Sequence, residues 1–291
     1  MATLAHPSGP RRVRFLPSRQ LDLSTDVVSL PLREQTPKHQ LQRFIQDTSE
    51  RTNLSLCRRG MQIRGANGTY FRVTCKNSWL CPNCTPLALR KFADKSVLLS
   101  RSAPQALAVV LTIRHDSSQP LSEVLKSLYG VKTAFLSGRS YDSFRKAYGI
   151  IGHGLITELK YSDTDGWNAH LQGIVFQENN SDSTPSPDLS DALQLRWVQT
   201  AHQQGVGASL EGQKAFLLPP DDRSNWARYN GKDHPRFTTS SVGSRTVGDI
   251  MHDALHGDFE AVSLFLEVEA ATKDRRRMAW TPKLEEKLHV R

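Results

Sequence analysis

The sequence lacks the features that mark a membrane, exported or repeat protein. Its longest apolar runs, such as Leu107 to Ile113, are far shorter than the roughly 18 to 20 residues of a membrane-spanning helix. No apolar segment precedes the first arginines, Arg11 and Arg12, so we expect no export signal. We find no internal repeat. These absences favour a cytoplasmic protein with no membrane partner.

Acidic residues are scarce at both ends of the chain. Residues 1–100 hold 16 Lys and Arg but 6 Asp and Glu, and residues 273–291 hold 7 against 3. Residues 101–272 are mildly acidic, with 15 against 20. Basic segments bind polyanions because contacts to phosphates release counterions. This distribution is typical of an acidic core with ends that bind nucleic acid, although solvated basic surfaces would give the same counts.

Cysteine is absent outside one short stretch, where all four occur: Cys57, Cys75, Cys81 and Cys84. The pair Cys81-Pro-Asn-Cys84 can present two thiolates to one ion, and the other two cysteines can complete a closed structural zinc site. A cytosolic location disfavours disulfides, and a redox role for the pair would leave the other two cysteines unexplained. The alternative is four unrelated thiols.

Hydrophobic periodicity predicts an α+β fold with an antiparallel sheet and helices on one face, the ferredoxin-like or RNA-recognition-motif-like plan. We expect four regions: a flexible basic arm (1–37), a zinc-binding, DNA-contacting region (38–100), a core (101–244) and a helical, basic C-terminal segment (245–291). The expected helices are 38–49, 85–100, 120–136, 189–204 and 221–232, and the expected strands are 107–114, 154–161, 168–177 and 209–218.

The strand 168–177 carries a candidate metal site. Alternation along a strand puts His170 and Gln172 on one face. If the turn before this strand is symmetric about Thr164, Glu158 lies opposite His170. These three side chains offer a nitrogen and oxygens to one Mg²⁺ or Mn²⁺ ion. A solvated strand face is the ordinary reading of such a pattern.

Four motifs occur in a fixed order: Cys81-Pro-Asn-Cys84, Val110-Leu-Thr-Ile-Arg-His115, Gly166-Trp-Asn-Ala-His-Leu-Gln172 and Ala227-Arg-Tyr-Asn-Gly-Lys232. In order and distance they resemble the rolling-circle plasmid replication initiators of the HUH endonuclease superfamily. The stretch from Glu267 to Leu284 is also similar to the tail of that family. The resemblance covers roughly residues 55–290.

The resemblance implies an HUH endonuclease core that nicks and rejoins one DNA strand at an origin, leaving a 5′-phosphotyrosine and a 3′-hydroxyl primer. Tyr229 would be the nucleophile, with Lys232 beside it, and His170 a ligand of the catalytic metal. An ammonium near the phenol favours the phenolate and neutralises phosphate charge. The implied partners are origin DNA, duplex and single-stranded at the nick, and host helicase and replication proteins.

Three positions depart from the family pattern. Gln172 replaces the second motif histidine, which predicts a weaker metal site. Asn225 stands where related initiators can carry a glutamate for the terminating step. His115 is a third ligand, a DNA contact or a plain strand-end residue. Two other functions remain: the same chemistry in a transposase or relaxase, and a non-catalytic zinc-dependent DNA-binding regulator on a decayed nuclease scaffold.

Overall fold

The computed structural model describes residues 37–51, 54, 57, 62–64, 70–72, 74–178, 188–230 and 243–290. The basic arm expected at residues 1–37 therefore lies outside the described residues, apart from its last position. Lys232 also lies outside them.

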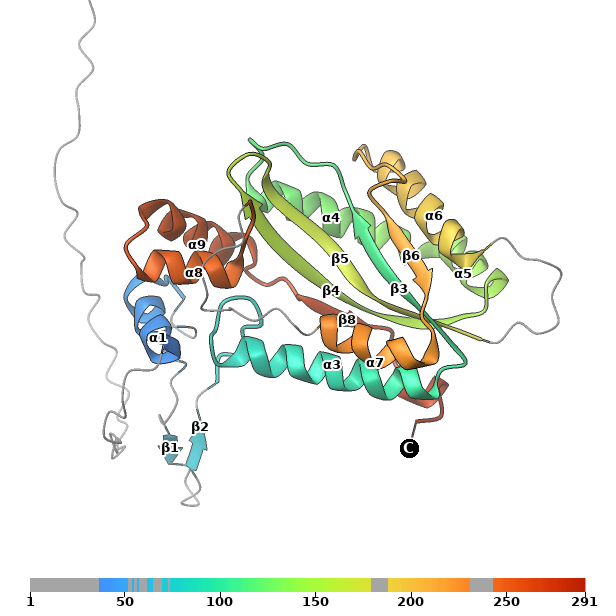
Figure 1. Cartoon of the computed structure of the whole chain (residues 1–291), viewed down its shortest axis with the longest axis horizontal. Coiled ribbons are helices and arrows are strands. Elements are labelled where there is room, and N and C mark those ends of the chain that lie inside the picture. The colour runs from blue at the N-terminus through green and yellow to red at the C-terminus, as the bar shows by residue number, and fades with distance from the viewer. Residues whose placement is uncertain are drawn as a thin grey trace, which may run out of the picture.

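A six-stranded sheet forms the centre of the described part of the chain (Figure 1). Its strands run in the order β6-β3-β5-β4-β7, and β8 also pairs with β4. Every pairing in this sheet is antiparallel, which confirms the expected α+β class and sheet type. The bounds are β3 Gln105–Thr112, β4 Ile150–Ser162, β5 Gly166–Gln177, β6 Lys214–Leu217, β7 Arg245–Thr246 and β8 Met278–Trp280.

Helices cover both faces of the sheet, not the single face expected from the sequence (Figure 1). On one side lie α4 (Leu121–Phe135), α5 (Gly138–Ala147) and α6 (Leu189–Gln203). On the other lie α3 (Cys84–Ser102) and α7 (Pro220–Asn230). The second layer is needed because β4 and β5 are apolar on both faces.

The side chains that require this second layer are Ile156, Ile174 and Phe176, each 1% exposed or less. Ile156 packs with Leu89 and Phe92 of α3, and the other two pack with residues of α3 and α7. Burying a large aliphatic or aromatic side chain contributes about 1.5–3 kcal/mol. Covering this face therefore fixes α3 and α7 on the sheet.

Helix α7 is held at both ends. Near its start, the Arg223 guanidinium donates to the carbonyl oxygens of Ser100 and Ala103 at the end of α3. Near its end, the Trp226 indole N–H donates to the Gly173 carbonyl in β5, at 2.9 Å. These contacts set the position of the residues at the end of α7 relative to β5.

A helical cluster lies at one end of the sheet, formed by α1 (Pro37–Thr48), α8 (Val247–Leu255) and α9 (Phe259–Ala271) (Figure 1). The Phe44 ring of α1 meets the Phe265 ring of α9 edge to face, with centroids 5.1 Å apart. The Glu267 carboxylate of α9 accepts hydrogen bonds from the Leu121 amide and the Trp167 indole. The cluster is therefore joined to α4 and β5. A separate antiparallel pair, β1 (Gln62–Arg64) and β2 (Tyr70–Arg72), precedes α3.

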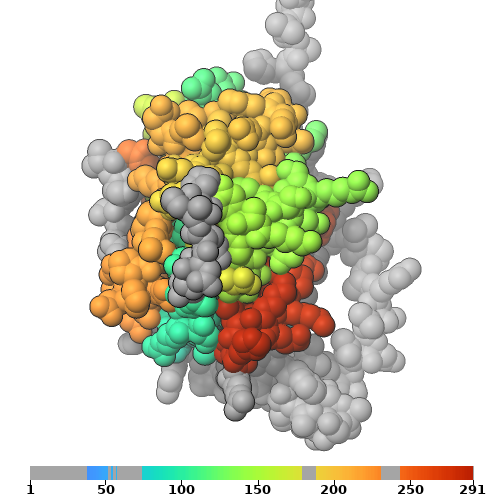
Figure 2. Space-filling model, turned by 90° about the vertical axis from the view of Figure 1, so that its right-hand side faces the viewer, coloured from blue at the N-terminus to red at the C-terminus, as the bar shows by residue number. Residues whose placement is uncertain are grey.

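The C-terminal segment is helical only in part. After α9 the chain forms β8 along β4 and ends in the short helix α10 (Leu284–Lys287). Gly154 of β4 permits this pairing, because a Cβ there would lie 2.2 Å from the Trp280 ring. Figure 2 shows the C-terminal residues beside α3, and Leu284 and Leu288 share an apolar cluster with Leu99 of α3 and Ala227 of α7.

No helix in the described ranges is both long enough and apolar enough to cross a membrane.

Candidate functional site

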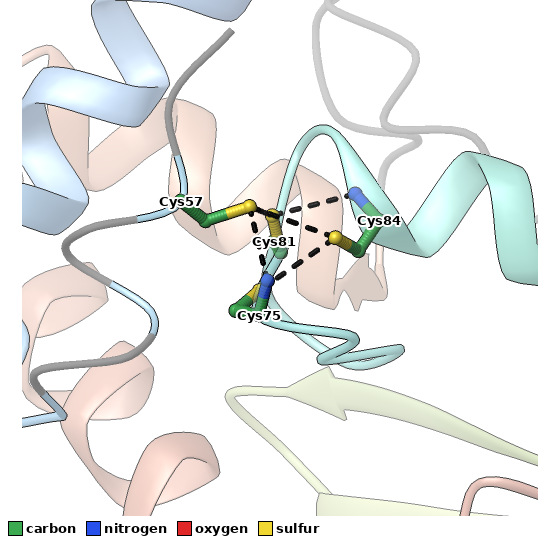
Figure 3. Close-up of side chains that lie close together, drawn as sticks. All are labelled: Cys57, Cys75, Cys81 and Cys84. Atoms are coloured by element: carbon green, nitrogen blue, oxygen red, sulfur yellow. Dashed lines mark hydrogen bonds between the residues drawn. The ribbon is translucent and has the colours of Figure 1, made fainter. Parts of the chain in front are cut away.

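The four cysteines come together in space, as the sequence predicted (Figure 3). All four sulfur atoms lie within 4.8 Å of one another. Three Sγ–Sγ separations are 3.6 Å (Cys57–Cys84), 3.7 Å (Cys75–Cys84) and 3.6 Å (Cys57–Cys81). A tetrahedral ion with metal–sulfur bonds of about 2.3 Å places its ligands about 3.8 Å apart. The cluster therefore has the dimensions of a four-thiolate metal site.

Backbone amides turn toward these sulfurs. The Cys84 amide lies 3.3 Å from the Cys81 sulfur, and the amides of Cys75 and Asn77 lie 3.4 Å from the sulfurs of Cys57 and Cys75. Such N–H groups stabilise thiolates that are bound to a metal. None of these four described cysteines is in a disulfide, and Cys57, Cys81 and Cys84 are buried.

Without a cation the sulfurs cannot all carry charge. Hydrogen bonding to Cys81 and Cys84, with burial, raises the pKa of Cys75, whereas hydrogen bonds from Cys75 and Cys81 lower the pKa of Cys84 to about 2. One thiolate is thus stabilised at the expense of its neighbours. A divalent cation would remove this competition because it favours all four thiolates.

The loop between Cys75 and Cys81 is anchored to the C-terminal segment. The Trp79 indole donates to the Arg275 carbonyl, and the Arg277 guanidinium donates to the Ser78 carbonyl. Arg277 is 2% exposed and also donates from Nε to the Thr157 carbonyl of β4. Arg277 therefore connects the cysteine loop with the strand that carries Glu158.

Glu158 and His170 face each other across β4 and β5, in the predicted register. His170 Nε2 lies 2.8 Å from Glu158 Oε2, and His170 Nδ1 lies 3.4 Å from Asn168 Oδ1. Two ligands in adjacent positions on an octahedral ion with bonds of about 2.1 Å lie about 3 Å apart. The observed 2.8 Å is the distance of a direct hydrogen bond, which a cation bound by both side chains would have to replace.

The Glu158 carboxyl is held ionised. Burial alone raises its pKa, but the hydrogen bond from His170 and the nearby charges of His170, Lys160 and Arg277 outweigh burial, and the net pKa lies below the ordinary value. A carboxylate charged at neutral pH is the form that binds Mg²⁺ or Mn²⁺. Its side chain is 19% exposed and that of His170 is 12% exposed, so both can reach solvent.

Gln172 lies next along the same face of β5, but it is 2% exposed. Among the described residues, its Nε2 atom has no hydrogen-bond partner. The same is true of both side-chain polar atoms of Asn230, the last residue of α7, which is 1% exposed and directly precedes residues outside the described ranges. Unsatisfied buried amides are costly in a folded protein. These two amides could therefore bind a polar ligand where α7 meets β5.

Tyr229 lies on α7, is 48% exposed and stacks on the Trp226 ring, with centroids 5.4 Å apart. Because Trp226 donates to the carbonyl of Gly173, the residue after Gln172, α7 brings Tyr229 toward the strand of the metal candidates. Asn225 is exposed on the same helix. Tyr229 is therefore connected to β5 only indirectly, through its ring contact with Trp226, and Lys232 falls outside the described residues.

His115 lies at another place, beyond the end of β3. It borders a polar hollow at the β4–β5 turn, together with Asp116, Ser117, Thr164, Asp165 and Asn168. Within the described ranges, its Nδ1 atom has no hydrogen-bond partner. Asn168 touches both this hollow and His170, so the hollow adjoins the His170–Glu158 pair.

Sequence reasoning missed three residues that shape this site: Trp226, Asn230 and Arg277. The first two flank Tyr229 on a helix that was predicted, so their proximity to the nucleophile candidate was a usable signal. Arg277 ends a run of three arginines that gives no sign of burial. Its role depends on long-range packing.

In the described part of the chain, the cysteine cluster is the one place where three or more His, Cys, Asp or Glu ligand atoms converge. The second candidate centre supplies only His170 and Glu158 from these residue types. Comparison of the chain with family models, curated proteins and solved structures gave no match in any of the three.

Proposed function

We propose that this protein is a DNA-nicking replication initiator that joins one strand to Tyr229 by transesterification. The observation that carries the proposal is the approach of α7 to β5, in which Trp226 of α7 donates to the Gly173 carbonyl. This contact brings a half-exposed tyrosine to the strand that holds His170, paired with Glu158.

The order of the elements supports a ferredoxin-like core of the HUH type. Along the chain, β3, α4, α5, β4, β5, α6 and β6 follow a β-α-β-β-α-β pattern in which α4 and α5 together take the place of the first helix. In space the four strands lie in the order β6-β3-β5-β4, with the two central strands first and third in sequence. This is the split β-α-β arrangement.

The reaction balances without a further reactant. The Tyr229 phenol loses its proton and its oxygen attacks the phosphorus, the bond from phosphorus to the 3′-oxygen breaks, and that oxygen takes a proton. One phosphodiester becomes a 5′-phosphotyrosine and a free 3′-hydroxyl. A cation held by Glu158 and His170, with Gln172 as the third candidate ligand, would stabilise the negative charge that develops at the phosphate. Lys232, three residues after Tyr229, would favour the phenolate.

The cysteine cluster would hold one structural zinc ion in the most basic third of the chain. A closed four-thiolate site has no open position for chemistry. Its function would be to order the segment between α1 and α3, which we assign to origin DNA. Host helicase and replication proteins are the expected further partners.

The test is formation of a covalent adduct. The purified protein, incubated with Mn²⁺ and a single-stranded oligonucleotide that contains its nick site, should give a product resistant to denaturation. Mass spectrometry should place the phosphate on Tyr229. Tyr229→Phe removes only the attacking oxygen and should reduce the adduct by at least about 10³-fold.

Tyr161→Phe is the matched control. Tyr161 lies next to the last residue of β4, the strand that carries Glu158, and its ring packs against Trp167. This variant should form the adduct at the wild-type rate. An adduct that survives in Tyr229→Phe, or one mapped to Tyr161, would show that the nucleophile is another residue.

A second function is favoured by one observation. Only His170 and Glu158 represent the usual metal-binding residue types, and Gln172 is buried. A scaffold that has lost cleavage would serve as a zinc-dependent DNA-binding regulator. Specific duplex binding with no adduct at any Mn²⁺ or Mg²⁺ concentration would establish this alternative.

A further inference from the structure

Three aromatic rings form a continuous line at the surface beside the proposed nucleophile. Phe216 of β6 meets Trp226 of α7 edge to face, with centroids 5.4 Å apart and an interplanar angle of 76°. Trp226 in turn stacks on Tyr229, at 5.4 Å and 23°. The two outer rings are exposed, Phe216 by 42% and Tyr229 by 48%. We call Phe216, Trp226 and Tyr229 the aromatic track.

The sheet register places Phe216 on the face that carries the metal candidates. Directly opposed residues of antiparallel strands point to the same side. Lys214 opposes Val110, and Val110 opposes Gln172, so Lys214 and Gln172 share one row and one face. Phe216 is two residues farther along β6, on that same face. Its neighbour Leu217 points to the opposite face.

Lys214 adds positive charge to this face. It is exposed and lies two strands from Gln172, about 10 Å away across the sheet. Arg228, also exposed, precedes Tyr229 on α7. The acidic residues of α7, Asp221 and Asp222, lie in its first turn, at the other end of the helix from Tyr229. The Tyr229 end of the track is therefore the basic end.

We infer that the aromatic track and Lys214 bind single-stranded DNA next to the cleaved phosphate, with an unpaired base stacked on the exposed Phe216 ring, while Trp226, which contacts both of its neighbours, holds the outer rings in place. This inference rests on the proposed function and specifies the form of its substrate. Exposed rings bind bases through their flat faces, and a duplex hides those faces in its own stack. The track spans at most about 11 Å, which corresponds to two or three nucleotides.

The experiment measures binding without cleavage. A fluorescently labelled single-stranded oligonucleotide and its duplex form are titrated without added Mg²⁺ or Mn²⁺, so that the cysteine site keeps its metal, and affinities are determined at several salt concentrations. Phe216→Leu keeps an apolar side chain but removes the π face. It should weaken single-strand binding by about 5- to 100-fold and leave duplex binding unchanged. Lys214→Gln should reduce the salt slope by about 0.7, the loss of one phosphate contact.

Leu217→Ala is the matched control, because Leu217 is 55% exposed on the same strand and points to the other face. It should bind single strands like the wild type. Thermal unfolding of each variant reports whether the fold is intact. The inference is overturned if Phe216→Leu, while folded, binds single strands like the wild type. It is also overturned if single-strand and duplex binding fall equally, which would indicate a duplex surface, or if Leu217→Ala weakens binding as much.

This result is separable from the adduct test. If the adduct forms on Tyr229 and Phe216→Leu changes nothing, the track is wrong and the nickase proposal stands. If no adduct forms but Phe216→Leu selectively loses single-strand binding, the track stands and the cleavage proposal fails.

Discussion

Arg277 supports the Glu158–His170 pair in two ways, through its positive charge and through its hydrogen bonds to the backbone. Glu158 is stabilised as a carboxylate partly by the nearby charge of Arg277, and burial lowers the pKa of Arg277 itself to about 10. Arg277 stays protonated at neutral pH because this value is still high. It also binds the backbone on both sides of its site, at Ser78 and at Thr157. A single buried guanidinium therefore helps to fix both the charge and the position of the strand that carries Glu158.

His170→Ala should abolish metal-dependent nicking while the protein stays folded. The His170 side chain is only 12% exposed and pairs with Glu158, so its removal also costs stability, and thermal unfolding has to show that the variant is folded at the assay temperature. Loss of a metal ligand should lower the nicking rate by about 100-fold or more. Supercoiled plasmid relaxation and duplex binding measure the two effects in parallel.

Asn168→Ala provides the comparison, because Asn168 is exposed and its side chain contacts the ring nitrogen of His170 that does not face Glu158. We expect a smaller loss that excess Mn²⁺ restores. Unchanged nicking in His170→Ala, or global unfolding with equal loss of DNA binding, would contradict the metal role.

The sequence predicted that Glu158 and His170 face each other, because this register depends only on nearby residues. A three-residue turn joins β4 and β5, so the register follows from the turn alone, and the opposition of Glu158 and His170 could be predicted. The burial of Gln172 could not be predicted from the sequence. It depends on the layer formed by α3 and α7, and no local sequence pattern shows which helix covers which face of the sheet.

At the scale of elements, α3 connects the cysteine cluster to the sheet. Its first residue is Cys84, its middle residues Leu89 and Phe92 cover Ile156, and Leu99 near its end packs in the cluster with Ala227 of α7. One rigid helix of 19 residues therefore spans the distance from the cysteines to the helix of Tyr229. A well-ordered cysteine cluster at the start of α3 therefore helps to fix the end of α3 that packs against α7.

Removal of the metal should destabilise more than the cysteine loop. We expect about one zinc per chain by elemental analysis, and a lower melting temperature with lower nicking activity after chelation, because metal binding supplies folding free energy to such sites. Cys81→Ser should lose the zinc and show the same shift.

Asn83→Ala is the control for this prediction. Asn83 lies between two of the cysteines, and its amide donates to Gln42 Oε1, but it offers no thiolate. It should keep its zinc. A metal-free wild-type protein with an unchanged melting temperature would refute the zinc assignment.

Most core elements followed from periodicity, and the exceptions have physical causes. Helix α5 was missed because none of its residues is fully buried, and the face that packs on the core carries few apolar residues, among them the partly buried Phe144. Strand β8 was missed because three residues after a run of arginines show no alternation. It becomes a strand only because the outer edge of β4 accepts it, and this long-range pairing leaves no local signal.

At the scale of the whole molecule, the C-terminal residues close the fold around β4. His153 of β4 is part of this closure, because its Nδ1 atom lies 3.2 Å from the Thr281 hydroxyl and its backbone bonds Thr281 in both directions. Burial, with the nearby charges of Lys132 and Lys287, lowers the pKa of His153 to about 4. The folded protein therefore holds this imidazole neutral.

This depressed pKa predicts acid sensitivity. Between pH 6.5 and 4 the unfolded chain binds a proton at His153 that the folded chain does not, so the free energy of unfolding falls as the pH is lowered through this window. The loss from His153 alone should be about 2 kcal/mol between pH 7.5 and 5. Denaturant unfolding at the two pH values measures it.

His153→Asn places an amide near the position of Nδ1 and cannot titrate. Every other group, including the cysteines, is common to both proteins. The difference in stability between the two pH values should therefore be smaller in the variant by about 2 kcal/mol. Equal differences would show that His153 is not the titrating group.

Because β8 comes late in the chain, it is synthesised well after β4, the strand with which it pairs. Residues 150–162 of β4 leave the ribosome about 120 residues before Met278 to Trp280. At about 5–20 residues per second, the outer edge of β4 from Gly154 to Ile156 waits roughly 6–24 s for its partner. During that interval Arg277 does not yet join Ser78 to Thr157, so the strand of Glu158 stays open on one side. Nascent chains therefore expose an unpaired edge during synthesis, and the Glu158–His170 pair gains its full support only when synthesis has passed residue 280.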